Sequence, residues 1–280
     1  IADQFVELTG TNYSTWAATG ITGSGYLGTD PKGSVVNAFC DPGIQGTDVF
    51  FYGGGHGDGS CNVVVKCDVR TFAYSVVGAP TPPAKYPPLY VSGFGGGPEA
   101  TYPSGKLMNG WFLPADQLTD PADTSYGTPL ARVSTHMYGA AAMRGTVIYY
   151  FYRTYAEFDT ATGVWGGQDV ALGPQLYAIN PNYNNQYLDQ GTMAVYDSVT
   201  DRFFVILVPG DGGGGWRSSM IVFNPTTRLI ENIYDSGAYG NINESSALQV
   251  IGRKLYIFNK APAAYDQPQV MNQGMIFDMD

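Results

Sequence analysis

The sequence has few basic residues and very little histidine, and the shortage of basic residues limits the partners that the protein can bind. Lys and Arg total 14 against 24 Asp and Glu, so the 280-residue chain carries a net charge of −10 at pH 7, and only 2 His are present. A protein that binds nucleic acid needs a basic surface to neutralise phosphates, and this composition offers none. We therefore expect no nucleic-acid partner.

Long apolar runs and helical periodicity are also missing. No run of 18 apolar residues occurs, which predicts no membrane-spanning helix. No window of ten residues combines an apolar repeat of helical period with caps at both ends. The first residue is Ile1 rather than Met, so we expect that the chain was processed or excised from a longer one.

Cysteine is scarce, with 3 residues at Cys40, Cys61 and Cys67. Their spacing matches no zinc site, because no second pair of Cys or His ligands accompanies them. Cys40 and Cys67 are expected on the first and third strands of one sheet, about 10 Å apart and therefore hard to bridge. We expect three buried free thiols.

Glycine, proline and tyrosine are abundant, with 37, 18 and 21 residues, while charged residues make up 14% of the chain. This composition favours many short strands joined by tight turns, and all-β chains of this length often form one domain. We therefore expect a single domain over residues 1–280. Low Lys with much Thr, Asn, Gly and Tyr is typical of secreted or virion-surface proteins.

A repeated pattern organises the chain. Residues 47–77 predict strands at 49–52, 62–68 and 72–77, with an inner strand at 35–40 and a turn at 69–71. An apolar strand ending in Asp or Asn before a polar turn recurs at Asp68, Asp159, Asn224 and Asp278. A propeller blade takes about 40–50 residues, so the first interval has room for one more, degenerate blade. The strands predicted before the later landmarks are 137–143, 146–152, 192–196, 202–208, 246–251 and 254–258.

The last copy lacks its outer strand, while residues 4–8 form a short strand with no blade of its own. Pairing these two ends would close a ring and hide two sheet edges. The run Gly53-Gly54-Gly55, an aromatic residue before the outer turn and Trp165 on an outer strand together resemble Kelch-type repeats, although the copies at Asn224 and Asp278 lack the double glycine. The segments GGGHGDGSCN and GTPLARVSTHMYG resemble a group of Kelch-like proteins in bacteria and phages. The resemblance implies an all-β fold, one β-propeller of five to seven four-stranded blades closed by the N- and C-terminal strands.

Three stretches fit no blade, namely residues 9–33, 78–129 and 166–190, and within the second of these residues 105–113 have the pattern of a hairpin. Long loops of this kind usually carry function or disorder, and tyrosine supplies rigid contact area for binding. Aromatic residues in or near such loops are candidates to stack on sugar rings. These candidates are Trp111, Tyr177, Tyr183, Tyr187 and Trp216. For Trp216 the alternative is that it caps a blade edge, and Trp165 is expected to pack within its blade.

Both histidines lie where turns of a propeller line one rim. His56, Asp58, His136 and Tyr138 are therefore expected near the axis, where the histidines either lock neighbouring blades or serve in catalysis. Lyases that act on acidic polysaccharides use His or Tyr as base and acid and an Arg to neutralise the carboxylate. The arginines available for that role are Arg132, Arg144 and Arg153, of which Arg144, beside Gly145, is expected to be a solvated turn residue.

Glycine-rich loops also hold Asp58 and Asp211, whose oxygens suit calcium, but no EF-hand spacing is present and no other cofactor is indicated. The sequence favours a non-catalytic module in a secreted or virion setting, such as a phage tail or receptor-binding component. Its partner would be a cell-surface glycan or polysaccharide, or another protein. The alternatives are a polysaccharide lyase that uses His56, His136, Tyr138 and Arg153, and a purely structural subunit.

Overall fold

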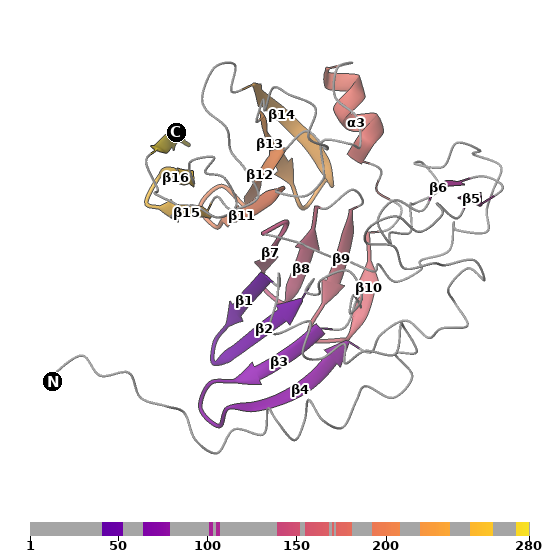
Figure 1. Ribbon diagram of the computed structural model, residues 1–280, viewed down its shortest axis with the longest axis vertical. Helices are drawn as coiled ribbons and strands as arrows, with labels where there is room; N and C mark the ends of the chain where they lie inside the picture. The colour runs from indigo at the N-terminus through magenta and orange to yellow at the C-terminus, as the bar shows by residue number, and fades with distance from the viewer. Residues whose placement is uncertain are drawn as a thin grey trace, which may run out of the picture.

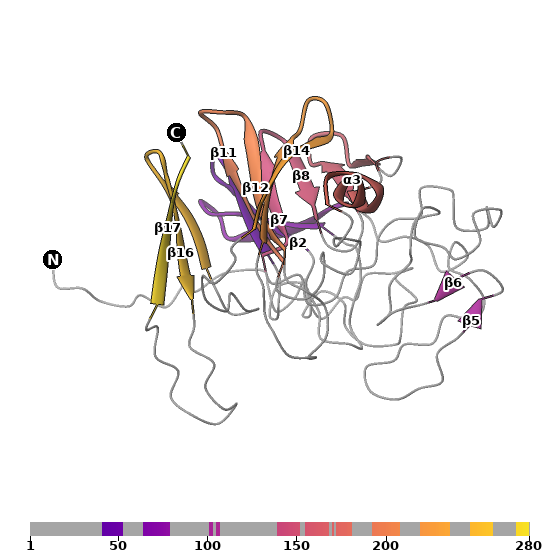
Figure 2. The ribbon, with the colours of Figure 1, turned by 90° about the horizontal axis from the view of Figure 1, so that it is seen from above.

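The computed structural model describes residues 41–52, 64–78, 101–102, 105–106, 139–151, 155–167, 170, 172–180, 192–207, 219–235, 247–259 and 273–279. In these ranges the protein is built from four larger antiparallel sheets, one two-stranded hairpin and one helix (Figures 1 and 2). The predicted all-β class is therefore confirmed.

Each larger sheet follows the chain order of its strands. The first sheet holds β1 (Asp41–Gln45), β2 (Asp48–Tyr52), β3 (Val64–Asp68) and β4 (Ala73–Gly78). The second holds β7 (Ala141–Arg144), β8 (Val147–Tyr150), β9 (Ala156–Asp159) and β10 (Val164–Gly166). The third holds β11 (Met193–Asp197), β12 (Arg202–Leu207), β13 (Ser219–Asn224) and β14 (Leu229–Asp235). The fourth holds β15 (Ala247–Ile251), β16 (Lys254–Asn259) and β17 (Gln273–Asp278).

The first strands of the four sheets lie side by side. β1 contacts β7, β7 contacts β11, and β11 contacts β15, while the later strands of each sheet spread outward (Figure 1). This radial order is the arrangement of blades in a β-propeller. Because β1 and β7 touch, no blade separates the first sheet from the second, although the sequence interval had room for one. The number of blades and the closure of the ring stay predictions, since residues 4–8 lie outside the described residues.

The core consists of apolar layers between neighbouring sheets. Strand β12, with the sequence RFFVIL, shows how one strand serves two layers. Phe203 packs with Tyr149 and Phe223 toward the second sheet, while Phe204 packs toward Leu255 of the fourth. Because successive side chains of a strand point to opposite faces, a sheet covered on both sides needs a continuous apolar run. This is why β12 could be predicted from its sequence.

The landmark residues owe their recurrence to a turn. Each ends the third strand of its sheet, and in three sheets its side-chain oxygen accepts a hydrogen bond from the backbone N–H two residues later, at 2.8 to 2.9 Å. Asp and Asn favour this local bond, which reverses the chain. The residue four places after the landmark is left-handed, with φ of 53° at Phe72, 70° at Gly163 and 59° at Arg228. The landmarks with this turn are Asp68, Asp159 and Asn224, while Asp278 ends β17.

The inner strand of the first sheet is β1, not the predicted stretch 35–40, which lies outside the described residues. The sequence of β1 is DPGIQ, which has low strand propensity. Pro42 is tolerated because β1 is an edge strand of its sheet. A Cβ on Gly43 would collide with the Met143 side chain, whose Cγ would lie 2.6 Å away. Packing against β7 therefore selects these residues.

A helix, α3 (Leu172–Ile179), lies in the stretch 166–190 that was predicted to be a loop. Leu172 and Leu176 are one turn apart and buried in the core, and Pro174 stands in the first turn, where proline is tolerated. The Gln175 side chain accepts a hydrogen bond from Ile230 N at 2.8 Å and donates one to Arg228 O at 3.2 Å. The helix is thus fixed to the outer strand β14 (Figure 1).

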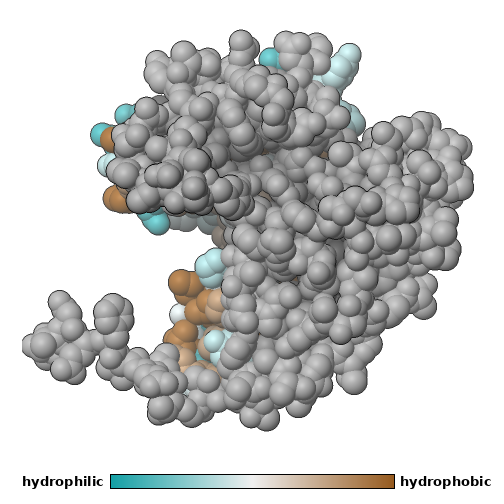
Figure 3. Space-filling model, in the orientation of Figure 1, coloured by the Kyte–Doolittle hydropathy of each residue, from teal (hydrophilic) through white to brown (hydrophobic). Residues whose placement is uncertain are grey.

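Other predictions are partly met. Cys67 on β3 is a buried free thiol, as predicted, whereas Cys40 and Cys61 lie outside the described residues. A short hairpin is formed by β5 (Thr101–Tyr102) and β6 (Gly105–Lys106), whereas most of the hairpin predicted at 105–113 lies outside the described residues. Apolar surface covers parts of the first and the fourth sheets on the two sides of an open gap (Figure 3). The exposed apolar side chains on these two sheets include Ile44, Val76, Ile251, Phe258 and Ile276.

Candidate functional site

Three of the residues singled out from the sequence lie within the described ranges. Tyr177 lies on α3, Arg144 ends β7, and Trp165 lies on the outer strand β10, as predicted. The structure does not test the remaining candidates. Those outside the described residues are His56, Asp58, Trp111, Arg132, His136, Tyr138, Arg153, Tyr183, Tyr187, Asp211 and Trp216.

Tyr177 stands on the outer side of α3. Its side chain is 59% exposed, and the neighbouring Ile179 is exposed as well, while Leu172 and Leu176 anchor the opposite side of the helix in the core. The two hydrogen bonds of Gln175 to β14 fix the helix further. The protein therefore presents an aromatic ring to solvent from a rigid base, which reduces the conformational entropy lost on binding.

Arg144 is not the solvated turn residue that the sequence predicted. Its guanidinium donates two hydrogen bonds to Asp201, of 2.6 and 2.7 Å, and Tyr196 Oη donates a third to the same carboxylate at 2.8 Å. The pair lowers the pKa of Asp201 and raises the pKa of Arg144. Since Asp201 follows β11, the pair ties the second sheet to the third. Arg144 is thus engaged and does not offer its charge to a substrate carboxylate.

A second tie between the same sheets surrounds Glu157. Arg228 Nε lies 2.9 Å from one carboxylate oxygen of Glu157, and Tyr155 Oη donates a hydrogen bond of 2.5 Å to that oxygen. Burial, and then this hydrogen bond, raises the pKa of Tyr155. Tyr155 therefore keeps its proton, and the cluster ties the second sheet to the third through Arg228.

The third and fourth sheets are joined in the same way. Asp197 at the end of β11 accepts a hydrogen bond of 2.7 Å from Arg253 in the β15–β16 turn. Arg253 also donates to the Met279 carbonyl at 2.7 Å. These ties could not be predicted from the sequence, because the partners are far apart in the chain. The signal available was weak: Arg144 and Arg253 each lie beside the glycine of a tight hairpin turn.

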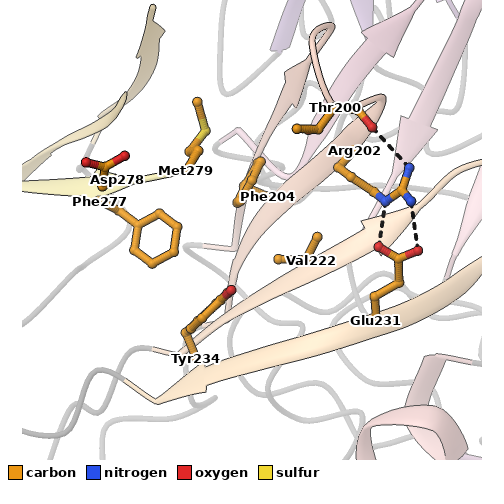
Figure 4. A pocket seen from close by; sticks show the side chains of 9 residues that line it. All are labelled: Thr200, Arg202, Phe204, Val222, Glu231, Tyr234, Phe277, Asp278 and Met279. Carbon is orange, nitrogen blue, oxygen red and sulfur yellow. Dashed lines mark hydrogen bonds and ion pairs between the residues drawn. The ribbon is translucent and has the colours of Figure 1, made fainter. Parts of the chain in front are cut away.

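A pocket of about 280 Å³ lies between the third and fourth sheets (Figure 4). One end is charged: Arg202 pairs with both carboxylate oxygens of Glu231, at 2.5 and 2.9 Å. The other end is aromatic, where the rings of Tyr234 and Phe277 meet edge to face with centroids 4.9 Å apart. The lining therefore joins a charged pair at one end to an aromatic pair at the other, and polar atoms make up most of the surface of the pocket. Its lining residues are Thr200, Arg202, Phe204, Val222, Glu231, Tyr234, Phe277, Asp278 and Met279.

Among the described residues, no group of three or more His, Cys, Asp or Glu is arranged to hold a metal ion. No helix in the described part of the chain is long and apolar enough to cross a membrane.

Comparisons with known proteins give little guidance. No protein-family model matches the sequence, and no curated protein matches it. Among solved structures, the chain is similar to the beta-propeller domain of the Trilobed protease from Pyrococcus furiosus, described as having an open velcro topology. The sequence identity is 8%, the TM-score is 0.30, and the alignment covers 86% of this chain and 56% of that one. At this TM-score the similarity supports no conclusion about fold or function.

Proposed function

We propose that this protein is a surface-recognition module that binds glycans through aromatic side chains on its loops and on α3. The observation that carries the proposal is the exposed ring of Tyr177 on a helix anchored to the core. An aromatic face held in place suits the stacking of a sugar ring, and the chain places Tyr183 and Tyr187 shortly after it.

The arrangement of charge supports binding over catalysis. The arginines Arg144, Arg228 and Arg253 all engage carboxylates of the neighbouring sheet. They hold the sheets together, so the described core serves as a rigid scaffold. Recognition then falls to the loops that the scaffold presents, as it does in many proteins of this architecture.

The finer fold belongs to the same proposal. We expect a Kelch-like propeller of five to seven blades, and the ordered contacts from β1 through β7 and β11 to β15 support a ring. The setting that we propose is extracellular or on a virion, where a propeller of this kind would contact a cell-surface glycan.

The test is a glycan array probed with purified protein, followed by titration of the best ligand. Tyr177→Ala should weaken binding by about fivefold, since stacking of one aromatic ring contributes on the order of 1 kcal/mol. The matched control is Val199→Ala, which removes an exposed apolar side chain from a different turn. Equal binding by both variants and the parent protein would exclude Tyr177 from the binding site. Binding to a protein but to no glycan would show that the ligand is a protein and would contradict the proposal.

The rival function, a polysaccharide lyase, would depend on His56, His136, Tyr138 and Arg153. It is tested by incubation with uronate-containing polysaccharides, because a lyase releases unsaturated products that absorb ultraviolet light. Product formation that is lost in His56→Ala or His136→Ala would contradict the proposal of a non-catalytic module.

A further inference from the structure

An irregularity in strand β14 places a carboxylate in the pocket between the third and fourth sheets. The pairing of β14 moves from Ile230 to Asn232 at two neighbouring residues of β13, so Glu231 is the extra residue of a β-bulge. In a regular strand, Glu231 and Tyr234 would lie on opposite faces of the sheet, because side chains alternate. With the bulge, both line the pocket (Figure 4). Bulges often redirect a side chain in this way next to a functional site.

The charged end of the pocket is held in a fixed geometry. Besides its two hydrogen bonds to Glu231, Arg202 donates to two carbonyl groups of the β11–β12 turn, at 2.9 and 3.1 Å. Asn224 Nδ2 donates to Glu231 Oε1 at 2.7 Å. The hydrogen bond from Arg202 lowers the pKa of Glu231, so the carboxylate is charged at neutral pH. A guanidinium has five N–H groups and a carboxylate has about four acceptor sites, so the pair can still donate to and accept from a ligand.

The aromatic end offers an exposed ring on a buried support. Tyr234 is 41% exposed, and its ring packs edge to face on Phe277. Phe277 packs in turn on Phe204, which is only 5% exposed, with ring centroids 6.2 Å apart. The hydroxyl of Tyr234 is turned toward Val222 and Phe204 (Figure 4). A ring supported in this way provides a stacking surface that loses little conformational entropy on binding.

Size and charge narrow the class of ligand. The volume of about 280 Å³ is close to the lower end of the range of about 300–1,000 Å³ for ligand sites, which suits one ring and not a long chain. The charged side chains of the lining are one guanidinium, of Arg202, and two carboxylates, of Glu231 and Asp278. An anionic ligand would therefore meet a net negative charge. An apolar ligand is disfavoured because polar atoms make up most of the surface.

We propose that this pocket binds one neutral pyranose unit of a glycan. The C–H face of the sugar stacks on the Tyr234 ring, one hydroxyl donates to Glu231, and the neighbouring hydroxyl accepts from Arg202. The planar ion pair suits two adjacent hydroxyl groups, because its donor and its acceptor lie side by side. The inference rests on the proposed glycan-binding function and adds a second site, whose lining does not include Tyr177, and a class of sugar.

The experiment follows the methyl resonance of Met279, which lines the pocket, in full-length protein labelled with ¹³C-methyl methionine. The probes are the methyl glycosides of glucose, galactose, mannose and N-acetylglucosamine, with methyl glucuronide as the charged counterpart. We expect at least one neutral glycoside to shift this resonance saturably, and the glucuronide to bind at least tenfold more weakly. The Met143 resonance, from the layer between the first and second sheets, should not move and reports whether each variant is folded.

Two substitutions test the two ends of the pocket. Tyr234→Ala should weaken binding of the neutral glycoside on the order of fivefold, by loss of stacking. Glu231→Gln keeps the shape of the side chain and should weaken that binding about tenfold, by loss of a charged acceptor. It should also narrow the preference over the glucuronide, because the charge of Arg202 is no longer neutralised. The matched control is Leu229→Ala, an exposed residue of the same strand outside the pocket, which should bind like the parent protein.

The outcomes separate this site from the proposed function. Binding on a glycan array without a shift of Met279 for any neutral glycoside would overturn the pocket and leave the proposed function standing. Neutral binding that is unchanged in both pocket variants, or glucuronide bound as tightly as the neutral sugars, would also overturn the pocket. A parent protein that binds no glycan at all would overturn the proposed function and this inference together.

Discussion

Asp197 of β11 and Arg253 of the β15–β16 turn form an ion pair of 2.7 Å across the boundary between the third and fourth sheets. The Asp197 side chain is only 2% exposed, and Thr200 Oγ1 also donates to it, at 2.6 Å. A carboxylate buried away from water stays stable in its charged form only if such donors replace the water. The pair therefore adds to the apolar packing that joins the fourth sheet to the third.

Replacing Arg253 should destabilise the protein strongly. Arg253→Met keeps most of the apolar stem but leaves the Asp197 carboxylate buried without its cation, and we expect a loss of about 3 kcal/mol in the free energy of unfolding. Urea unfolding followed by fluorescence measures the change. The control is Arg70→Met, whose pair with Asp68 is local and exposed to solvent, so that its loss should change stability far less. Equal effects of the two variants would contradict the prediction.

Acid should weaken the contacts between sheets. The Arg144 guanidinium lowers the pKa of Asp201. Burial acts to raise the pKa of Asp197, but hydrogen bonds from Thr200 and Arg253 outweigh it, and the pKa is lowered. A carboxyl whose pKa is lower in the folded state stabilises the fold above its unfolded pKa of about 4, and this stabilisation is lost as the pH falls through the folded value.

We therefore expect the urea midpoint to be steady from pH 7 to about 5 and to fall below about 4. Asp201→Asn should flatten that fall, because it removes one of the titrating groups. A midpoint that rises as the pH is lowered from 5 to 3 would show that these carboxylates do not stabilise the folded state.

The close approach of β1 and β7 predicts a specific rescue. Gly43→Ala would place a methyl group against the Met143 side chain and 3.2 Å from Tyr52 Oη, and should cost about 1–3 kcal/mol. Met143→Ala in the same chain should recover part of that loss, since it removes the colliding atoms. The control is Gly252→Ala, which meets nothing within 4 Å but has a φ of +60°. Its cost should be about 1 kcal/mol and should not change with Met143→Ala.

Cys67 should react slowly with alkylating reagents. Burial of the thiol raises its pKa above the ordinary value, and the thiolate is the form that reacts. Brief treatment of the native protein with iodoacetamide at pH 8, followed by mass spectrometry of the peptide containing Cys67, should find little modification. The same treatment in urea should modify Cys67 fully. Rapid labelling of the native protein would show that β3 is open to solvent.

The sequence was informative where local chemistry decides the structure. Strands β8, β12 and β16 are apolar runs bounded by turn residues, and Asp68 and Asn224 mark turns because their own side chains form them. Trp165 was also predicted correctly to lie on an outer strand, since it follows the turn that the Asp159 side chain forms.

Elements selected by their neighbours escaped prediction. β1 contains Pro42 and Gly43 because it lies at a sheet edge and packs tightly on β7. α3 is too short for a clear period and is held by Gln175 on β14. Arg144 gave no sign of its partner, since Asp201 lies 57 positions away. The proposed sugar-binding residues share this difficulty, because loops far apart in sequence must converge to form a site.

The hydrogen bonds between Gln175 and β14 have a consequence for solubility. An edge strand has unpaired backbone N–H and C=O groups to which strands of other chains can add. Helix α3 protects the start of the edge strand β14, because the Gln175 side chain is hydrogen-bonded to Ile230 N and Arg228 O. Removal of the Gln175 side chain would leave these two backbone groups open to another chain, so Gln175→Ala should aggregate more readily than the parent protein.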